Sequence, residues 1–267
     1  MYYLSEIFIY PVKSLGGISL ESAVVTDRGL KYDRRWLLID KTGSFITQRD
    51  YPQMALISVE LREKSLELKH KKNGASLSIN IETNNEEKTE VVIWDDNVMA
   101  NQVSKEADYW LSKMLNIKCR LVYMPDESNR VVDKKYANGN EIVSFADGYP
   151  FLIIGQSSLD DLNSRLDKKL PMNRFRPNLV FTGGAPFDED RIKSFMIGDV
   201  KFYPVKPCAR CVVTTVDQES GVKNEEPLKT LASYRTVGNK VMFGQNLLHK
   251  GSGTIKIGDE LKILEWK

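Results

Sequence analysis

Apolar positions in the first half of the chain recur in short runs that are typical of β-strands. Runs rich in β-branched and apolar residues cover Ile7–Tyr10, Trp36–Ile39, Met54–Leu61, Ser76–Ile81 and Glu90–Ile93. Within Leu66-Glu-Leu68 and the fourth run, polar and apolar residues alternate, which places one face of each strand on a core. Turn-forming residues separate the runs at Ser14–Gly17, Lys41–Gly43, Lys72–Gly74 and Thr83–Asn85. This pattern predicts a β-barrel or a curled sheet.

The period of the apolar positions changes after Ser104 and predicts helices. Ser104 is a suitable N-cap, and apolar residues follow at helical spacing at Ala107, Trp110, Leu111, Met114 and Leu115. A second helix is expected after Ser157 and a third from Pro227. Strand-like runs return at Asn178–Phe181, Val200–Val205, Cys211–Val216 and Thr254–Leu264. The predicted fold is mostly β with a few packed helices (α+β), divided near residue 120.

Composition and charge exclude several classes of protein. The 267 residues suit one or two globular domains, and 38 basic minus 36 acidic side chains give a net charge of +2. A general nucleic-acid or membrane-surface binder needs a larger basic excess, so we expect neither partner, and any anion must be bound locally. The longest apolar run, Tyr149–Ile154, is too short to cross a bilayer. Three cysteines and the absence of a recognisable signal peptide favour a reducing, cytoplasmic location.

Two of the cysteines form the pair Cys208-Ala-Arg-Cys211. A structural zinc site needs about four ligands, which Cys119, His70 and His249 do not supply at a known spacing. A thioredoxin-like pair would continue into a helix, whereas a β-branched run follows Cys211. Both readings are therefore disfavoured.

A thiolate between cations is the remaining chemical reading of this pair. Lys206 and Arg210 lie near it in sequence, and their charges would lower a cysteine pKa and prepare a nucleophile or a ligand for a soft metal. Two incidental small residues remain an open alternative.

Basic residues also stand at strand ends and turns, where side chains from separate segments can converge. They are Lys13, Arg34, Arg49, Arg174 and Arg176. Lysine and the planar guanidinium of arginine are the usual partners of phosphate and carboxylate groups. Each one alone could equally be a surface ion-pair partner, and no P-loop or dinucleotide-binding glycine motif is present in the sequence.

Seven motifs spread along the chain together resemble a known family. They are Tyr-Pro-Val-Lys-Ser (10–14), Gly-Leu with Asp-Arg-Arg-Trp (29–36), Thr-Gln-Arg (47–49), Asn-Arg-Phe-Arg-Pro-Asn (173–178), Cys-Ala-Arg-Cys with Thr-Thr-Val-Asp (208–217), Phe-Gly-Gln-Asn (243–246) and Gly-x-Ile-x-x-Gly-Asp (253–259). The chain resembles MOSC-domain proteins that carry a MOSC N-terminal β-barrel domain, and is similar to the mitochondrial amidoxime-reducing component (mARC) and bacterial YcbX-type members. The resemblance implies a MOSC N-terminal β-barrel-like domain at 1–120, packed on a MOSC β-barrel domain at 121–267.

The resemblance also implies a molybdenum cofactor, a molybdopterin whose metal is held by one cysteine, here Cys211. Positions that match the family's pyranopterin and phosphate contacts are Lys13, Ser14, Arg34, Arg176 and Asn178, with Arg210 beside the metal ligand. Further positions implied at the same site are Asp147, Gly148, Tyr149 and Asn246. Cys208 is expected to have no ligand role.

The implied reaction is the two-electron reduction of N-hydroxylated small molecules such as amidoximes, hydroxylamines and N-hydroxylated bases to amines. Asp147 is a candidate proton donor. Because the chain begins near its first strand and ends at Lys267, we expect neither a membrane anchor nor a C-terminal ferredoxin domain. Electrons would then come from a separate ferredoxin-, flavodoxin- or cytochrome b5-like protein with its reductase. Two alternatives are a cofactor carrier or sulfur-transfer protein without reductase activity, and a binder of another phosphorylated ligand.

Overall fold

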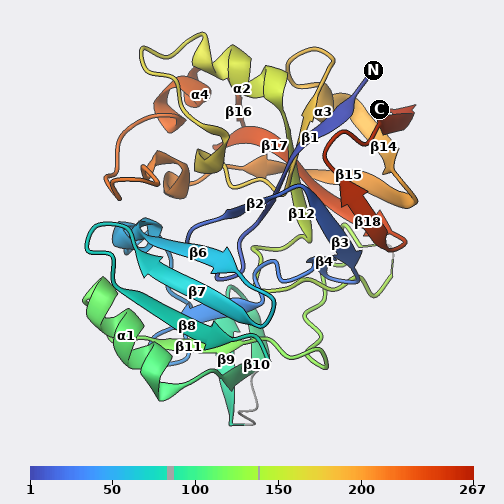
Figure 1. Ribbon diagram of the computed structural model, residues 1–267. Coiled ribbons are helices and arrows are strands. Elements are labelled where there is room, and N and C mark those ends of the chain that lie inside the picture. The colour runs from blue at the N-terminus through green and yellow to red at the C-terminus, as the bar shows by residue number, and fades with distance from the viewer. Residues whose placement is uncertain (83–86, 138) are drawn as a thin grey trace.

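The computed structural model describes residues 1–82, 87–137 and 139–267 and consists mainly of β-strands. Most strands of the C-terminal half form one large curled sheet, and smaller sheets with helix α1 form the rest (Figure 1). The predicted mostly β architecture with a few helices is therefore confirmed.

The largest sheet supports the C-terminal half of the molecule. Its strands, in spatial order, are β19 (Leu261–Trp266), β14 (Ile192–Ile197), β15 (Val200–Ala209), β17 (Lys240–Lys250), β12 (Phe151–Gly155), β13 (Leu179–Thr182), β1 (Tyr3–Ile9) and β2 (Ile18–Leu20), with β16 (Thr236–Val237) added to β17. The backbone N–H of Leu261 donates to the carbonyl of Tyr2 at 2.9 Å, and that of Gly258 donates to Leu4 at 2.8 Å. These bonds bring the two ends of the sheet together, so it curls toward a barrel around a core of aliphatic and phenylalanine side chains.

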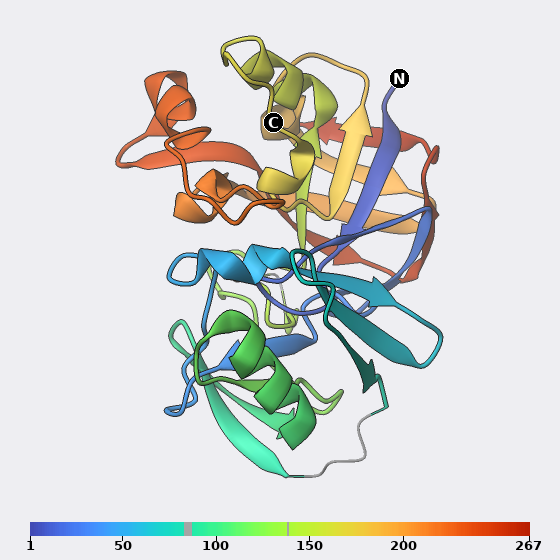
Figure 2. The ribbon, with the colours of Figure 1, turned by 60° about the vertical axis from the view of Figure 1, so that its left-hand side comes forward.

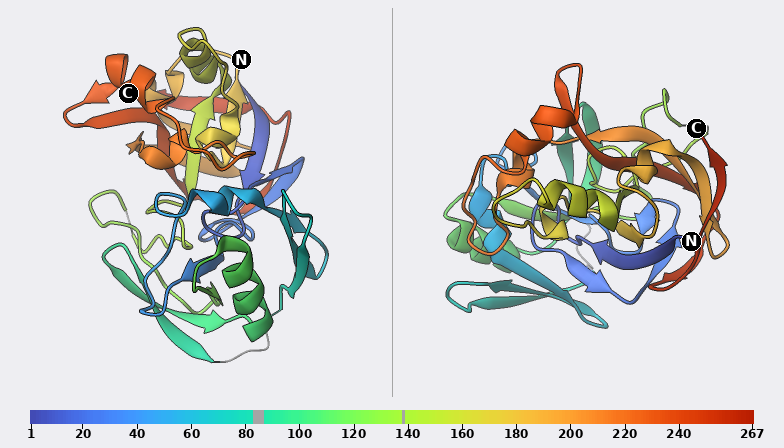
Figure 3. Two further views of the ribbon diagram at one scale, coloured as in Figure 1. Left: turned by 90° about the vertical axis from the view of Figure 1, so that its left-hand side faces the viewer. Right: turned by 90° about the horizontal axis from the view of Figure 1, so that it is seen from above.

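The first strands of the chain belong to this C-terminal sheet. β1 pairs with β13, and a small sheet joins β18 (Gly253–Lys256), β3 (Ser22–Thr26) and β4 (Gly29–Leu30). In Figures 1 and 3, the dark blue N-terminal strands accordingly lie among the strands of the C-terminal half. The division into 1–120 and 121–267 stays a prediction, and strand pairing crosses it.

Two sheets and one helix make up the remaining N-terminal part (Figure 2). One sheet contains β5 (Trp36–Ile39), β11 (Arg120–Tyr123), β10 (Asp96–Gln102) and β9 (Lys88–Ile93), and the other contains β6 (Ile57–Leu61), β7 (Ser65–His70) and β8 (Ser76–Asn80). Helix α1 (Lys105–Leu115) has the predicted cap, because the Ser104 hydroxyl accepts from the backbone N–H of Ala107 at 3.1 Å. Its buried face packs in one core with Trp36 and Leu68.

Helix α2 (Gln156–Asn163) starts earlier than expected, and Ser157 is not its cap. The N-cap is Gly155, which has no side chain to offer. The buried carboxylate of Glu189 takes that place: it accepts from the Gly155 backbone N–H at 3.2 Å and from the Ser158 hydroxyl at 2.8 Å. A residue distant in sequence thus supplies the acceptor, which local pattern does not indicate.

The other helices are α3 (Asp188–Arg191), α4 (Leu228–Tyr234) and the 3-10 helices Pro52–Leu56, Met172–Arg174 and Val212–Thr215. α4 lies where a helix from Pro227 was predicted. None of the helices among residues 1–82, 87–137 and 139–267 is long and apolar enough to span a bilayer.

Three expected strands need correction. Cys211–Val216 is not a strand but holds a 3-10 helix, because the hydroxyls of Thr214 and Thr215 each donate to the carbonyl three residues earlier, at 3.0 and 2.7 Å. Met54 lies in a 3-10 helix before β6, and Gly258, at φ +92°, separates β18 from β19 within the expected run 254–264. The turn expected at Thr83–Asn85 lies outside the described residues.

Burial of Glu189 predicts a pH-dependent stability. Burial raises the pKa of this carboxyl from 4.5 to about 7, against the opposing hydrogen bond from Ser158. The folded chain therefore retains a proton that the unfolded chain releases, so the free energy of unfolding should fall as pH rises from about 4.5 to 7. Glu189→Gln should remove this component, whose slope is at most about 1.4 kcal/mol per pH unit. Urea unfolding of both proteins at pH 4.5, 6 and 7.5 measures it, and parallel curves would contradict the assignment.

Candidate functional site

An ion pair between Lys13 and Asp147 joins the N-terminal and C-terminal parts of the chain. The Lys13 ammonium donates to Asp147 Oδ1 at 2.6 Å and to the Phe145 carbonyl at 2.7 Å. Burial lowers the pKa of Lys13 to about 8, although the Asp147 charge favours its protonated form. Lys13 is thus a buried cation that can lose its proton near neutral pH.

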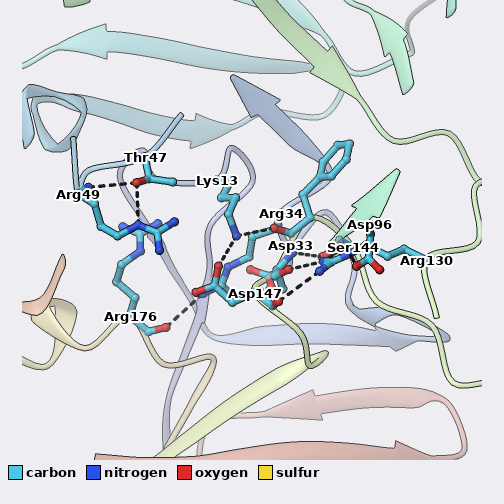
Figure 4. Close-up of polar contacts among 12 residues, drawn as sticks. Lys13, Asp33, Arg34, Thr47, Arg49, Asp96, Arg130, Ser144, Asp147 and Arg176 are labelled. Atoms are coloured by element: carbon cyan, nitrogen blue, oxygen red, sulfur yellow. Dashed lines mark hydrogen bonds and ion pairs between the residues drawn. The ribbon is translucent and has the colours of Figure 1, made fainter. Parts of the chain in front are cut away.

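Asp147 faces solvent at the same point, with a side chain that is 76% exposed. Burial by the surrounding chain opposes its ionisation, but the charge and hydrogen bond of Lys13, and the charges of Arg49 and Arg34, hold its pKa well below the ordinary value. Solvent that reaches the carboxylate screens these charges in part. Asp147 is therefore an accessible, ionised carboxylate among cations (Figure 4).

Two arginines converge on the buried ring of Tyr10. The guanidinium carbons of Arg34 and Arg176 lie 4.3 and 4.1 Å from the ring centroid. Arg34 pairs with Asp33 at 2.6 Å, whereas Arg176 forms no ion pair among the described residues, and burial lowers the pKa of Arg176 to about 10. Arg34 and Arg176 have backbone φ angles of 49° and 55°, in the left-handed region that residues other than glycine seldom adopt. The folded chain thus holds both positively charged residues in a strained backbone conformation.

Supporting residues fix the position of Arg34. The Asn178 Oδ1 accepts from Arg34 Nη1 at 3.1 Å and from the Leu152 backbone at 3.2 Å, while its Nδ2 donates to the Phe8 carbonyl. Asn178 is 2% exposed, so in this structure it orients the guanidinium. Gly17 leaves room for the Tyr10 ring, because a Cβ there would lie 2.5 Å from it.

Ser14 follows Lys13 at the start of the same turn, with φ of 68°. Its carbonyl accepts from Gln48 Nε2 at 2.7 Å, and Gln48 in turn exchanges hydrogen bonds with Gln218. Both glutamines are buried. This contact connects the turn at Lys13 with the segment that follows Cys211.

Cys211 is an exposed free thiol that directly follows Arg210 in the chain. Its neighbour Arg210 donates through Nη2 to the carbonyl of Phe175 at 2.5 Å and through Nη1 to the Cys208 sulfur at 3.0 Å. The charge of Arg210 acts on Tyr10 together with Arg34 and Arg176, so the three guanidiniums share one neighbourhood. The predicted convergence of Lys13, Arg34, Arg176 and Arg210 is observed, and Lys206 instead lies over the rings of Tyr136 and Tyr149.

Two other predicted positions, Tyr149 and Asn246, contact Lys206, and a third, Gly148, precedes Tyr149 in the chain. Tyr149 packs edge-on against Tyr136 with centroids 5.9 Å apart, and burial raises its pKa. Asn246 Nδ2 donates to the Lys206 carbonyl at 3.2 Å. Gly148, beside Asp147, has open space at the position of a Cβ.

Two buried arginines hold the backbone of the segments that carry site residues. Arg174, a member of the predicted basic set, donates to the carbonyls of Thr214 and Glu226 and so anchors the segment after Cys211. Arg130 was missed by sequence reasoning because it lies in no motif. It pairs with Asp96 at 2.7 Å and donates to three carbonyls of the segment that ends at Asp147, namely Ser144, Ala146 and Asp147.

A cavity elsewhere among the described residues lies apart from this site. That cavity, of about 710 Å³, is lined by side chains such as Tyr32, Arg35 and Tyr123, and none of the predicted site residues lines it. No group of three or more His, Cys, Asp or Glu residues that could by itself hold a metal ion was found in the described part of the chain. A metal bound at Cys211 would therefore need further ligands from a cofactor.

The groups at the basic cluster fit such a cofactor. The buried Arg210 Nε and Tyr10 hydroxyl have no hydrogen-bond partner among the described residues. Unsatisfied buried groups of this kind are expected where a polar ligand completes the network. Cations suit its phosphate, and the exposed Cys211 sulfur suits a soft metal.

Comparisons with known proteins agree with this arrangement. The family model of the MOSC N-terminal beta barrel domain matches residues 1–118, and that of the MOSC domain matches 140–262. The chain is 32% identical to mitochondrial amidoxime-reducing component 1 of Mus musculus, over 98% of this chain and 82% of the relative. It is 33% identical to the protein of the same name from Homo sapiens, with the same coverage.

A molybdenum cofactor sulfurase from Oryza sativa is 34% identical over 91% of this chain, which spans 32% of that longer protein. The relatives thus carry two kinds of name, one for amidoxime reduction and one for a molybdenum cofactor sulfurase. Similarity over nearly the whole chain and the two matching models lead to one conclusion: the chain belongs to the family of MOSC-domain proteins that carry a MOSC N-terminal β-barrel domain.

Proposed function

We propose that this protein binds a molybdenum cofactor and uses it to reduce N-hydroxylated small molecules to amines. The observation that supports this most strongly is the convergence of Lys13, Arg34, Arg176 and Arg210, the last of which directly precedes the exposed Cys211 in the chain. A focused group of cations on a nearly neutral chain suits one anionic cofactor rather than a polyanion. The named activity of the amidoxime-reducing relatives supports the reaction class.

In this proposal, Cys211 is the protein ligand of the metal, and Arg34, Arg176 and Lys13 hold the cofactor's anionic groups. Ser14 and Asn178 belong to the same binding region, with Asn178 orienting Arg34. Gly148, Tyr149 and Asn246 would line its other side. The bound cofactor would supply a two-electron redox centre that can accept an oxygen atom.

Asp147 and Lys13 would handle substrate binding and protons. Because Asp147 is held ionised, it can accept a hydrogen bond from the N-hydroxyl group and orient it. Its low pKa makes it a weak proton donor. Lys13, with a pKa of about 8 and 2.6 Å from Asp147, is better suited to supply a proton, and solvent can return one through the exposed carboxylate.

The balanced reaction consumes two electrons and two protons per N–O bond and yields an amine and water. The electrons would come from a separate ferredoxin-, flavodoxin- or cytochrome b5-like donor with its reductase. We retain the cytoplasm as the proposed location.

The second candidate is a cofactor carrier or sulfur-transfer protein without reductase activity. It is favoured by the sulfurase relatives, which match over 91% of this chain or more. Both candidates use the same cofactor site, so the reduction of benzamidoxime by metal-loaded protein with reduced viologen distinguishes them.

Replacement of Cys211 tests the metal ligand. Cys211→Ala should lower the molybdenum content of protein from a cofactor-competent host by at least about tenfold, because the single protein ligand is lost. Cys208→Ala is the matched control and should retain the metal. Inductively coupled plasma mass spectrometry gives both values. Wild-type protein without molybdenum would contradict both candidate functions.

Replacement of Arg176 tests the anion grip. Arg176→Ala removes a charge-assisted contact worth about 1.5–3 kcal/mol, so cofactor affinity should fall roughly tenfold or more. Arg191→Ala removes the same charge from a side chain that is 72% exposed, and should not change occupancy. Molybdenum content and far-UV circular dichroism of the two variants are compared. Equal occupancy would remove Arg176 from the anion site.

Anion binding to cofactor-free protein should depend on pH through Lys13. As pH rises through about 8, Lys13 loses its charge, so affinity for sulfate should weaken, by about tenfold at the limit. Sulfate keeps a constant charge over this range. Lys13→Arg should bind with little change from pH 7 to 9, because arginine stays protonated. Calorimetric titrations at these pH values provide the measurement, and a flat wild-type profile would exclude Lys13 from the anion site.

A further inference from the structure

Trp94 is an exposed tryptophan that contributes little to any core. Its side chain lies at the turn between β9 and β10, the residue is 43% exposed, and its backbone has φ of 56°. Exposing an indole and holding a bulky residue in the left-handed region both cost free energy. Strain and apolar exposure of this kind concentrate at functional positions.

Arg49 and Phe45 hold the indole in place. The Arg49 guanidinium carbon lies 4.4 Å from the Trp94 ring centroid and 5.6 Å from that of Phe45, and the two rings are 5.2 Å apart. Thr47 Oγ1 accepts from Arg49 Nε at 3.1 Å and fixes the arginine. We refer to Phe45, Arg49 and Trp94 as the aromatic wall.

The aromatic wall adjoins the proposed reaction site. The Lys13 ammonium lies 5.7 Å from the Phe45 ring centroid, and the charge of Arg49 contributes to the low pKa of Asp147. Arg49 thus contacts the rings of Phe45 and Trp94, and its positive charge also acts on the exposed carboxylate of Asp147. Figure 4 shows Arg49 among the cations around Asp147.

The wall and Asp147 share one rigid support. Asp96, two residues after Trp94, binds Arg130 at 2.7 Å, and Arg130 donates to the carbonyl of Asp147 at 3.2 Å. Arg130 is 4% exposed and makes further bonds to the carbonyls of Ser144 and Ala146. The spacing between the indole and the carboxylate is therefore set by packed structure rather than by a free loop.

We propose that the aromatic wall is the specificity-determining surface for substrate, binding planar aromatic N-hydroxylated compounds by stacking on Trp94 while Asp147 orients the N-hydroxyl group. The inference rests on the proposed function. Arg49 and Phe45 pack against the indole, and Trp94, which is 43% exposed, offers the rest of its apolar surface to a flat, uncharged ring. Small aliphatic hydroxylamines have no ring to stack and gain nothing from the wall.

Trp94→Ala tests this. The ratio of kcat/KM for benzamidoxime to kcat/KM for hydroxylamine should fall about tenfold, mainly through the KM of benzamidoxime, since the stacking contact with its ring is lost. Trp94→Phe should restore most of the ratio. Trp266→Ala is the matched control, because Trp266 is also half-exposed, at 45%, and it should leave the ratio unchanged.

A second readout does not depend on turnover. Binding of benzamide, which is planar, neutral and unreactive here, should weaken about tenfold in Trp94→Ala and stay constant in Trp266→Ala. An unchanged substrate ratio and unchanged benzamide affinity would overturn the proposal. A lower molybdenum content in Trp94→Ala would also overturn it, because the wall would then serve the cofactor. If wild-type protein reduces neither substrate, the proposed function fails. Benzamide binding alone then decides whether the aromatic wall binds planar rings.

Discussion

The contact of both Arg34 and Arg176 with one tyrosine ring is the constraint on which the site depends. The two like charges repel, and burial makes the repulsion stronger than it is in water. Asp33 and Asn178 compensate on the Arg34 side, and the π face of Tyr10 serves both guanidiniums. The charge of Arg176 and the Arg210 Nε donor have no such partner among the described residues, and an anionic ligand would stabilise both.

Rigid backbone supports keep these charges in place. Arg130 and Arg174 are buried and donate hydrogen bonds to main-chain carbonyls. Arg130 binds the segment that ends at Asp147, and Arg174 binds the segment after Cys211. An arginine fork can bind several carbonyls at once, which makes it suited to fixing irregular chain. The reciprocal Gln48 and Gln218 bonds add a link between the two parts of the molecule. The two segments that carry candidate site residues are thereby held by side-chain hydrogen bonds to their backbone, outside the strands of the sheets.

Local pattern succeeded where short-range physics decides conformation. The helix at Lys105–Leu115 follows from an apolar stripe and the Ser104 cap, and both act within one turn. It failed after Cys211, where β-branched residues favour a strand but threonine hydroxyls close a 3-10 turn. It also failed at α2, whose cap acceptor is Glu189, more than thirty residues away.

The sequence by itself determined the mostly β class, the family, and the set of residues that could bind an anion and a soft metal, because motif chemistry and apolar periodicity are local properties. Only the tertiary structure decided which of these residues meet. Lys13 and Asp147 are 134 residues apart and lie 2.6 Å from each other, a contact that no spacing rule contains. Arg130, in no motif, and Trp94, in a plain turn, gained their importance from neighbours that folding alone brings to them.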